Sequence, residues 1–223
     1  MILVKPSFEI EQFNGLQMLM NIEKAGRTCY KSESAITQDS AFAFVQKIIR
    51  MGHESVLEHE KISVRIICDR GVSHEIVRHR LASYSQSSTR YVDSAKGGCC
   101  FVIPPWVNTS PGVYSDVETK RMFKGGCWAD TIWFYQMLSA EDAYLHLRNE
   151  GLAPQQARSV LPNSTKTELV MTANLREWRH FFKLRTSPAA HPQMREISIP
   201  LLQGMANMLP FVFDDCLKME ESK

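Results

Sequence analysis

Apolar residues recur three and four positions apart in several stretches of the chain, a spacing typical of amphipathic helices. Near the N-terminus this pattern predicts one helix from Ile10 towards Gly26 and another from Asp39 to the residue before Gly52. In the second helix, the residues expected to face the core are Phe42, Val45, Ile48 and Ile49. Glycine readily adopts the left-handed conformation found just after a helix, so Gly52 is suited to end it.

The same spacing predicts the helices of the C-terminal half. They are Trp128 to Leu147, Pro154 to Val160, Asn174 to Arg185, and His191 to Leu209 with a kink at Pro200. The first would bury Ile132, Tyr135 and Leu138, and the last Ile197, Leu201, Leu202 and Met205. The helix from Asn174 has an apolar stripe of Leu175, Trp178 and Phe182 and a basic one of Arg176, His180 and Lys183, with Arg179 beside it and Arg185 at the end. We expect it to bury one side and offer positive charge on the other.

Alternating apolar and polar residues predict strands at Ile62 to Asp69 and at Lys166 to Thr172, and a short apolar run predicts another at Ile2 to Val4. After the strand at Asp69, Gly71 breaks the pattern and Ser73 is placed to cap a short helix. That helix would bury Val72, Ile76 and Val77, while Glu75, Arg78 and His79 would share another face.

Proline and glycine between Asp93 and about Lys124 favour loops over regular structure. Elsewhere strands and helices follow one another without steady alternation. The pattern therefore predicts an α+β fold with a mixed or antiparallel sheet and packed helices, as a single domain over residues 1–223.

Composition adds limits to this picture. With 223 residues, 44% of them hydrophobic, the chain is long enough for one substantial core, and its formal charge of +2 is too small to indicate a nucleic-acid-binding protein. The six cysteines lack CxxC spacing, which favours reduced thiols over zinc ligands. No apolar run is long enough to span a membrane, and we expect a cytoplasmic protein.

The stretch from Arg78 to Tyr91 reads RHRLASYSQSSTRY and has the composition of an anion site. Its serine and threonine side chains are poorly suited to a hydrophobic core, but their hydroxyls donate hydrogen bonds. Its guanidinium groups match the oxygens of a phosphate. We expect it to start at a helix end and to continue as a serine-rich loop. Because the chain has no glycine-rich phosphate loop, a bound nucleotide would be held by side chains.

Two other chemistries are open to the polar residues. His53 and His59 lie six residues apart, which does not fit the HExxH zinc motif, so we expect no metal there. His53 and Ser55 would instead contact a ligand while Glu58 orients a cation. The alternative is a nucleophile, Ser88 or a cysteine, with His79 as base, because Arg78 and Arg80 would keep the imidazole neutral.

Several segments resemble those of the flavin-dependent thymidylate synthases. They are Arg78-His79-Arg80 followed after seven residues by Ser88, HESVLEH at His53 to His59, ARSVLP at Ala157 to Pro162, and the late helix with Asn174, Arg176 and Arg185. The resemblance implies that family's α+β fold and a homotetramer with active sites at subunit interfaces. It also implies methylation of dUMP to dTMP with FAD, NADPH and methylenetetrahydrofolate and without an enzyme nucleophile, so Ser88 would bind ligand.

The resemblance also assigns residues to roles. FAD contacts would come from His53, Ser55, Arg78, His79, Arg80, Gln86, Asn174, Arg176 and His180. Contacts with dUMP would come from Glu75, Arg78, Gln86, Ser87, Ser88, Thr89, Arg90, Arg158 and Arg185. Arg185 would be catalytic, because a fixed guanidinium beside the uracil stabilises its anionic form electrostatically.

Three positions depart from the family pattern. Ser85 and Gln86 replace an asparagine and a glutamate found in many members, so a carboxylate contact there would become a neutral amide contact. Glu75 stands where glutamine is common, and its charge would repel the dUMP phosphate unless Arg78 or His79 pairs with it. No role follows for His191.

Two alternative functions use the same residues. A nucleic-acid-binding module would place Arg78, Arg80, Arg90 and the basic face of the Asn174 helix on phosphates. A non-catalytic flavoprotein would keep the flavin contacts without turnover. Flavin retention separates the first alternative from an enzyme, and dTMP formation separates the second.

Overall fold

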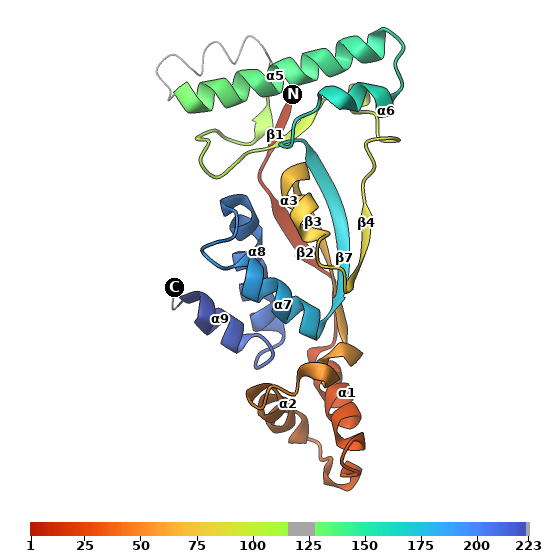
Figure 1. Ribbon diagram of the computed structural model, residues 1–223, viewed down its shortest axis with the longest axis vertical. Helices are drawn as coiled ribbons and strands as arrows, with labels where there is room; N and C mark the ends of the chain where they lie inside the picture. The colour runs from red at the N-terminus through yellow and green to blue at the C-terminus, as the bar shows by residue number, and fades with distance from the viewer. Residues whose placement is uncertain (116–127, 222–223) are drawn as a thin grey trace. The chain divides into compact units, whose positions relative to one another are not determined.

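The structure is a computed structural model that describes residues 1–115 and 128–221 (Figure 1). The chain forms two compact units, and each is assembled from separate stretches of sequence. Unit 1 comprises Met1–Ser7, Ile66–Arg78 and Ser85–Leu169, and unit 2 comprises Phe8–Arg65, His79–Tyr84 and Val170–Lys223. The α+β class predicted from the sequence is confirmed, whereas the single domain stays a prediction.

Unit 1 contains a three-stranded sheet in the order β5-β1-β6. Strand β1 (Ile2–Val4) pairs in parallel with β5 (Cys100–Val102) and antiparallel with β6 (Gly112–Val113), so the sheet is mixed. The helices of this unit are α3 (Arg70–Ile76), η3 (Ser94–Lys96), α5 (Trp128–Asn149), α6 (Pro154–Ala157) and η4 (Arg158–Val160). Its core includes Leu3, Phe101, Phe134, Met137 and Tyr144, which come from two of the strands and from α5.

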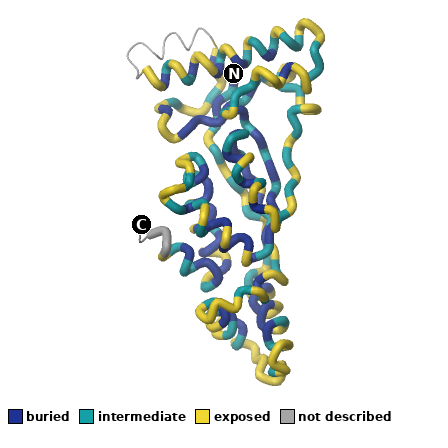
Figure 2. Tube along the Cα trace, in the orientation of Figure 1, coloured by how far each residue is buried: buried dark blue, intermediate teal, exposed yellow. Residues whose placement is uncertain are grey.

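Unit 2 is mainly helical. Its helices are α1 (Gly15–Thr28), η1 (Glu33–Ala35), α2 (Ser40–Arg50), η2 (Glu54–His59), α7 (Leu175–Arg185), α8 (Pro192–Met208) and α9 (Asp214–Glu221). Aromatic residues of α7 form the centre of the core: the rings of Trp178 and Phe182 stack 5.8 Å apart, and Phe213 meets Phe182 edge-on at 5.6 Å. Figure 2 shows α7 mostly in the colour of buried residues.

A four-stranded sheet has the order β2-β3-β7-β4. Its strands are β2 (Ser7–Ile10), β3 (Lys61–Asp69), β4 (Ala82–Gln86) and β7 (Lys166–Asn174). Every second residue of β7 is buried, namely Thr167, Leu169, Met171 and Ala173, as the alternation predicts. Both β3 and β7 begin in one unit and end in the other.

Most predicted elements are confirmed to within a few residues, including both alternating strands and the helices now labelled α2, α5, α7 and α8. Gly52 follows α2 with a φ of +72°, the left-handed conformation expected after a helix. Pro200 lies inside α8, as predicted. The described cysteines are free thiols, and Cys127 lies outside the described residues.

The first helix begins later than predicted. Ile10 ends strand β2, and α1 begins only at Gly15. The signal for this start is Asn14, whose side-chain oxygen accepts a hydrogen bond from the Gln17 backbone N–H at 3.0 Å. The apolar spacing continued through the strand and concealed this boundary.

The short helix α3 also differs from the prediction. Asp69 caps it in place of Ser73, because the Asp69 carboxylate accepts from the Val72 N–H at 2.6 Å. The Ser73 hydroxyl lies inside the helix and donates to the Arg70 carbonyl at 2.9 Å. Since α3 ends at Ile76, His79 lies beyond it and does not share a helix face with Glu75.

Two predicted loops contain strands. Residues 82–86 of the serine-rich stretch form β4, and the proline- and glycine-rich segment contributes η3, β5 and β6. The part of that segment from residue 116 to 124 lies outside the described residues. These strands were missed because the serines of β4 and the very short β5 and β6 lack the apolar alternation that indicates a strand.

The buried faces of two helices differ from the prediction. In α5, Ile132 is 61% exposed and Tyr135 is 44% exposed, while Phe134 and Met137 are buried. In α2, Ala41 takes the buried place expected for Phe42. Apolar residues occur on more than one face of each helix, so spacing alone did not identify the core face. None of the helices, over the residues described, is both long and apolar enough to span a membrane.

Candidate active site

The transition from strand β7 to helix α7 positions several candidate residues in unit 2. Asn174 is the N-cap of α7, and its side-chain oxygen accepts a hydrogen bond from the Glu177 N–H at 2.8 Å. This bond orients the carboxamide of Asn174, and its NH₂ group can donate to a ligand. The cap also fixes the first turn of α7, on which Arg176 and Glu177 lie.

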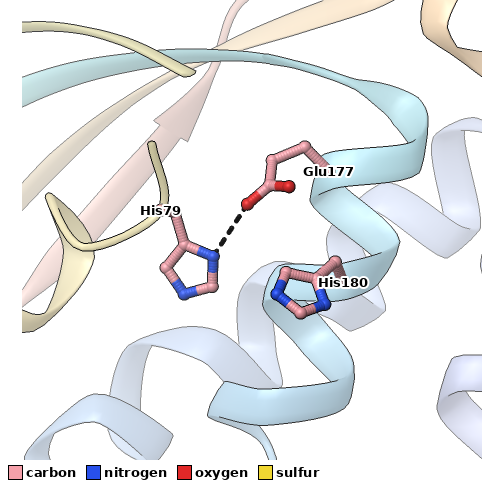
Figure 3. A group of neighbouring side chains, drawn as sticks. All are labelled: His79, Glu177 and His180. Carbon is pink, nitrogen blue, oxygen red and sulfur yellow. Dashed lines mark hydrogen bonds and ion pairs between the residues drawn. The ribbon is translucent and has the colours of Figure 1, made fainter. Parts of the chain in front are cut away.

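His79 is buried and is held on both sides of its ring. Its Nδ1 lies 2.9 Å from Glu177 Oε1, the bond drawn in Figure 3, and its Nε2 lies 3.1 Å from Arg185 Nε. A guanidinium nitrogen always donates, so Nε2 must accept the bond from Arg185. The hydrogen of the neutral ring therefore resides on Nδ1 and is donated to the Glu177 carboxylate.

The surroundings keep His79 neutral. Burial lowers the pKa of His79, and the nearby charges of Arg185 and His180 lower it further, while the hydrogen bond with Glu177 acts in the opposite direction. The net effect is a pKa below the usual 6.5. The sequence predicted a neutral imidazole, but it attributed this to Arg78 and Arg80, whereas the causes are burial and residues of α7.

His79, Glu177 and His180 together form a group with the residue types of a metal site. Their ligating atoms lie within 4.8 Å of one another, and Figure 3 shows all three side chains. However, both ring nitrogens of His79 are already hydrogen-bonded, and the Arg185 guanidinium at Nε2 would repel a cation. The geometry favours an organic ligand over a metal ion, and the expected absence of a metal stays a prediction.

Ion pairs connect η2 with α7. Glu58 Oε1 accepts from Arg176 at 2.6 Å, in agreement with the prediction that Glu58 orients a cation. Glu54 accepts from Arg179 Nη2 at 2.9 Å, and Asp215 of α9 accepts from the same guanidinium at 2.6 Å. Arg179 is only 1% exposed, so it does not add to the positive charge beside the basic stripe as predicted. Arg176 and His180 are exposed, as predicted.

A cavity of about 810 Å³ lies within unit 2, between α1, α2 and η2. Its lining includes His53 and Ser55, both predicted from the sequence to contact a ligand, together with the cations Arg27 and Lys47. Its volume is in the range of cofactor and substrate pockets. The sequence did not single out Arg27 and Lys47, because nothing in their own segments relates them to the HESVLEH stretch.

Two of the predicted dUMP residues of unit 1, Arg158 and Thr89, lie together. Arg158 Nη1 donates to the Thr89 hydroxyl at 2.9 Å, which joins two segments that the sequence assigned to the same ligand. A pocket of about 420 Å³ is lined by both residues together with Arg70 and His74. Arg70 and His74 were not predicted, although they lie four residues apart on α3, a spacing that places side chains on one helix face.

Gln86 is oriented by two hydroxyl groups in unit 1. Its Nε2 donates to Ser73 Oγ and to Thr167 Oγ1, each at 3.0 Å. This leaves the Gln86 side-chain oxygen to accept from a ligand, the neutral amide contact expected where the family often has glutamate. Further along, Ser88 Oγ accepts from the Arg90 N–H at 3.2 Å, so this serine orders the backbone of its own segment.

The structure thus divides the predicted residues between the two units. Unit 1 holds Glu75, Arg78, Gln86, Ser87, Ser88, Thr89, Arg90 and Arg158, and unit 2 holds His53, Ser55, His79, Arg80, Asn174, Arg176, His180 and Arg185. Within unit 2, His79 meets both His180 and Arg185. Glu177 was missed, because it lies 98 residues from His79 and no local pattern connects the two.

Solved structures with the same fold are known. The UMP/dUMP methylase PolB from Streptomyces cacaoi, bound with 5-Br dUMP, superposes with a TM-score of 0.74 at 24% sequence identity, covering 98% of this chain and 97% of that one. Thymidylate Synthase X (ThyX) from Helicobacter pylori, with FAD and dUMP, gives a TM-score of 0.74 at 23% identity, covering 96% of this chain and 99% of that one. These likenesses establish the fold.

Sequence comparison establishes the family. The profile of the thymidylate synthase complementing protein family, Thy1, matches residues 17–211. A flavin-dependent thymidylate synthase from Mycobacterium sp. (strain JLS) is 37% identical over 206 residues, covering 87% of this chain and 78% of that protein. The one from Mycobacterium avium (strain 104) is 36% identical over 203 residues with the same coverage. The chain therefore belongs to this family and is an enzyme of the thymidylate synthase class.

Proposed function

We propose that this protein methylates dUMP to dTMP, with methylenetetrahydrofolate as one-carbon donor and with FAD and NADPH supplying the reducing equivalents. The observation that carries the proposal is the placement of Arg185, whose Nε is held by His79 at the end of α7. This bond fixes one edge of the guanidinium, whose fork of donors matches a planar acceptor such as the uracil ring. The flavin-dependent thymidylate synthases among the relatives, and the solved structure of ThyX with FAD and dUMP, support the choice of flavin and dUMP.

The residues of α7 and η2 suit a flavin nucleotide. Arg176 and His180 are exposed on one side of α7, and the Asn174 amide lies at its start. These donors match a ligand with a pyrophosphate and a ring rich in hydrogen-bond acceptors. We assign FAD contacts to His53, Ser55, Arg78, His79, Arg80, Gln86, Asn174, Arg176 and His180. When bound, the flavin supplies the redox chemistry.

The residues of unit 1 suit the nucleotide phosphate. Arg158 and Arg70 line one pocket with their guanidinium groups. The Thr89 hydroxyl lines the same pocket and accepts a hydrogen bond from Arg158. We assign dUMP contacts to Glu75, Arg78, Gln86, Ser87, Ser88, Thr89, Arg90, Arg158 and Arg185. Ser88 acts there as a binding residue and not as a nucleophile.

Arg185 has the catalytic role. Its positive charge stabilises negative charge on the uracil ring, and this makes the ring carbon at position five more nucleophilic towards the one-carbon unit. The neutral His79 is important here, because an imidazolium could not accept the bond that orients Arg185.

The decisive experiment measures flavin retention and product formation in one preparation. After incubation with FAD and gel filtration, the protein should keep the flavin absorbance, and it should form dTMP from dUMP when NADPH and methylenetetrahydrofolate are added. A colourless protein without product would contradict the proposal. Retained flavin without product would indicate the non-catalytic flavoprotein. DNA binding is disfavoured, since Arg179 is buried and adds no charge to the basic face of the helix.

The assembly and the compartment belong to the same proposal. We expect a cytoplasmic homotetramer with active sites at subunit interfaces. Light scattering should give a mass of about 102 kDa, four times the 25.5 kDa of one chain. A monomer of 25.5 kDa that is nevertheless active would contradict this assembly.

A further inference from the structure

We propose that Glu177 is a positioning residue for the reaction. By accepting from His79 Nδ1 it fixes the tautomer of His79 in which Nε2 accepts from Arg185, and it thereby orients the catalytic guanidinium. The inference rests on the proposed function, in which Arg185 acts on the uracil. Glu177 itself touches neither substrate nor flavin in this assignment. It acts through His79, at a distance of two hydrogen bonds.

The three groups form a continuous chain of hydrogen bonds. Glu177 Oε1 lies 2.9 Å from His79 Nδ1, and Arg185 Nε lies 3.1 Å from His79 Nε2. With the hydrogen on Nδ1, both contacts pair a donor with an acceptor. With the hydrogen on Nε2, two N–H groups would face each other at Arg185, and a lone pair would face the carboxylate at Glu177. The carboxylate therefore selects the tautomer that Arg185 requires.

The three residues linked by these hydrogen bonds are held in place by their neighbours. The Glu177 N–H is bonded to Asn174, and the Arg185 carbonyl accepts from Ser198 Oγ at 2.7 Å. The His79 ring lies 4.9 Å from that of Phe181, and the His79 carbonyl accepts from the Tyr84 hydroxyl at 2.7 Å. Because His79 and Glu177 are only 4% and 6% exposed, water does not readily replace either partner.

Protonation of His79 would break the hydrogen bond between His79 and Arg185. An imidazolium has no acceptor at Nε2, and it would stand as a second cation beside Arg185. The titratable and charged groups around the ring are Glu177, His180 and Arg185 of α7 and Tyr84 of β4. Among these only the Glu177 carboxylate favours the imidazolium. Removing its charge should therefore lower the pKa of His79 further.

The test is the substitution Glu177→Gln. The glutamine amide can either accept from Nδ1–H or donate to Nδ1, so both tautomers would be populated and only part of the protein would hold Arg185 correctly. We expect retained flavin, a kcat for dTMP formation lowered about tenfold at pH 8, and a smaller change in KM for dUMP. The acid limb of the pH profile of kcat should move to lower pH, because the His79 pKa falls.

The matched control is Glu141→Gln. Glu141 is also a glutamate with little exposure, 13% at its side chain, but it belongs to unit 1, where it pairs with the N-terminal ammonium at 2.6 Å. We expect its kcat profile to keep the shape of the wild type. If Glu177→Gln shows the kcat and the acid limb of the wild type, Glu177 does not position Arg185, and the inference is wrong.

NMR measures the tautomer of His79 directly and does not depend on enzyme activity. In protein labelled with ¹⁵N-histidine, the His79 signals are identified by their loss in His79→Gln, and their shifts report which nitrogen carries the hydrogen. The wild type should show the Nδ1–H tautomer and Glu177→Gln a mixture. An Nε2–H tautomer in the wild type would overturn the inference. Failure of the proposed function is seen separately, as absence of dTMP formation by the wild type.

Discussion

At the scale of single residues, the guanidinium of Arg185 has two tasks that need different atoms. Its Nε is bonded to His79, and its terminal nitrogens face the ligand in the proposed mechanism. A lysine ammonium is a point charge on a flexible chain and cannot donate along two fixed directions. The role of this residue therefore depends on its shape as well as its charge.

We predict that Arg185→Lys retains FAD but loses dTMP formation by about 100-fold or more, a magnitude typical of removing one donor that stabilises a developing anion. The measurements are flavin absorbance after gel filtration and kcat. Arg50→Lys, an exposed arginine of α2, is the matched control and should behave as the wild type. Wild-type kcat in Arg185→Lys would remove the catalytic assignment.

Arg158 provides a test of the phosphate assignment. Arg158→Ala removes one charge from the pocket that also contains Arg70 and His74, so dUMP should bind about 10- to 100-fold more weakly, as expected for a lost charge-assisted hydrogen bond. Thr89→Val removes only the hydroxyl bonded to Arg158 and should have a smaller effect. Titration calorimetry measures both, and unchanged dUMP affinity in Arg158→Ala would place the phosphate elsewhere.

The sequence grouped some residues that lie in contact, but it did not reveal all of their partners. Arg158 and Thr89 were assigned to one ligand and do lie in contact. Glu177, in contrast, looked like an ordinary acidic residue in the first turn of a helix, where carboxylates are common for reasons of the helix dipole. Its role depends on a contact with His79 that only the folded chain creates.

At the scale of elements, Arg179 joins three helices of unit 2. Its guanidinium, on α7, bonds Glu54 of η2, Asp215 of α9 and the carbonyl of Val212. Because η2 also carries Ser55 and α7 also carries His180, this buried cation sets the spacing of elements that we assign to the flavin. Its loss leaves two carboxylates without their common partner.

We predict that Arg179→Met lowers the free energy of unfolding by about 2 kcal/mol. This is less than for a fully buried pair, because the Asp215 side chain is 45% exposed and water screens part of the charge. The matched control is Arg176→Met, which removes the exposed pair with Glu58 and should cost about 0.5 kcal/mol or less. Urea unfolding of the flavin-free proteins measures both, and equal losses would contradict the special role of Arg179.

The same cluster predicts a dependence on pH. Burial would raise the pKa of Glu54 and Asp215, but the hydrogen bonds and charge of Arg179 outweigh it and lower both below the usual 4.5 and 3.8. Carboxylates with lowered pKa stabilise the fold fully above their unfolded values and lose this effect as pH falls through the folded values. The difference between wild type and Arg179→Met should therefore shrink from pH 7 to about pH 3. A constant difference would exclude these carboxylates as the cause.

Elements with one clear apolar face were predictable, and those defined by distant pairing were not. The stripe of Leu175, Trp178 and Phe182 identified the buried side of α7, and all three are fully buried. Strand β5 is only three residues long, and it exists because it pairs with β1. Such pairing between distant segments leaves little trace in local sequence.

At the scale of the whole molecule, the chain passes repeatedly between its two units. The crossings fall at residues 7/8, 65/66, 78/79, 84/85 and 169/170, and β3 and β7 are each shared. Neither unit is a continuous segment that a simple truncation would isolate. This path supports the prediction of one domain over residues 1–223.

We predict that both units unfold together in urea. The chain has four tryptophans. Trp178 is buried in unit 2 and Trp133 packs against the core of unit 1, so a variant that keeps only Trp178 of the four reports on unit 2, and one that keeps only Trp133 reports on unit 1. Because breaking β3 or β7 disrupts both units, the two fluorescence midpoints should coincide. Separate midpoints would show that the units are independent domains.

The distribution of free thiols makes the protein suitable for site-selective labelling. Cys68, Cys99 and Cys216 are buried, and burial raises the pKa of these thiols to about 12, about 12 and about 11, so almost no thiolate is present at neutral pH. Cys29 is exposed and lines the cavity that contains His53 and Ser55. Of the described cysteines, a maleimide dye should therefore modify Cys29 first, which places an optical reporter at a pocket assigned to the flavin.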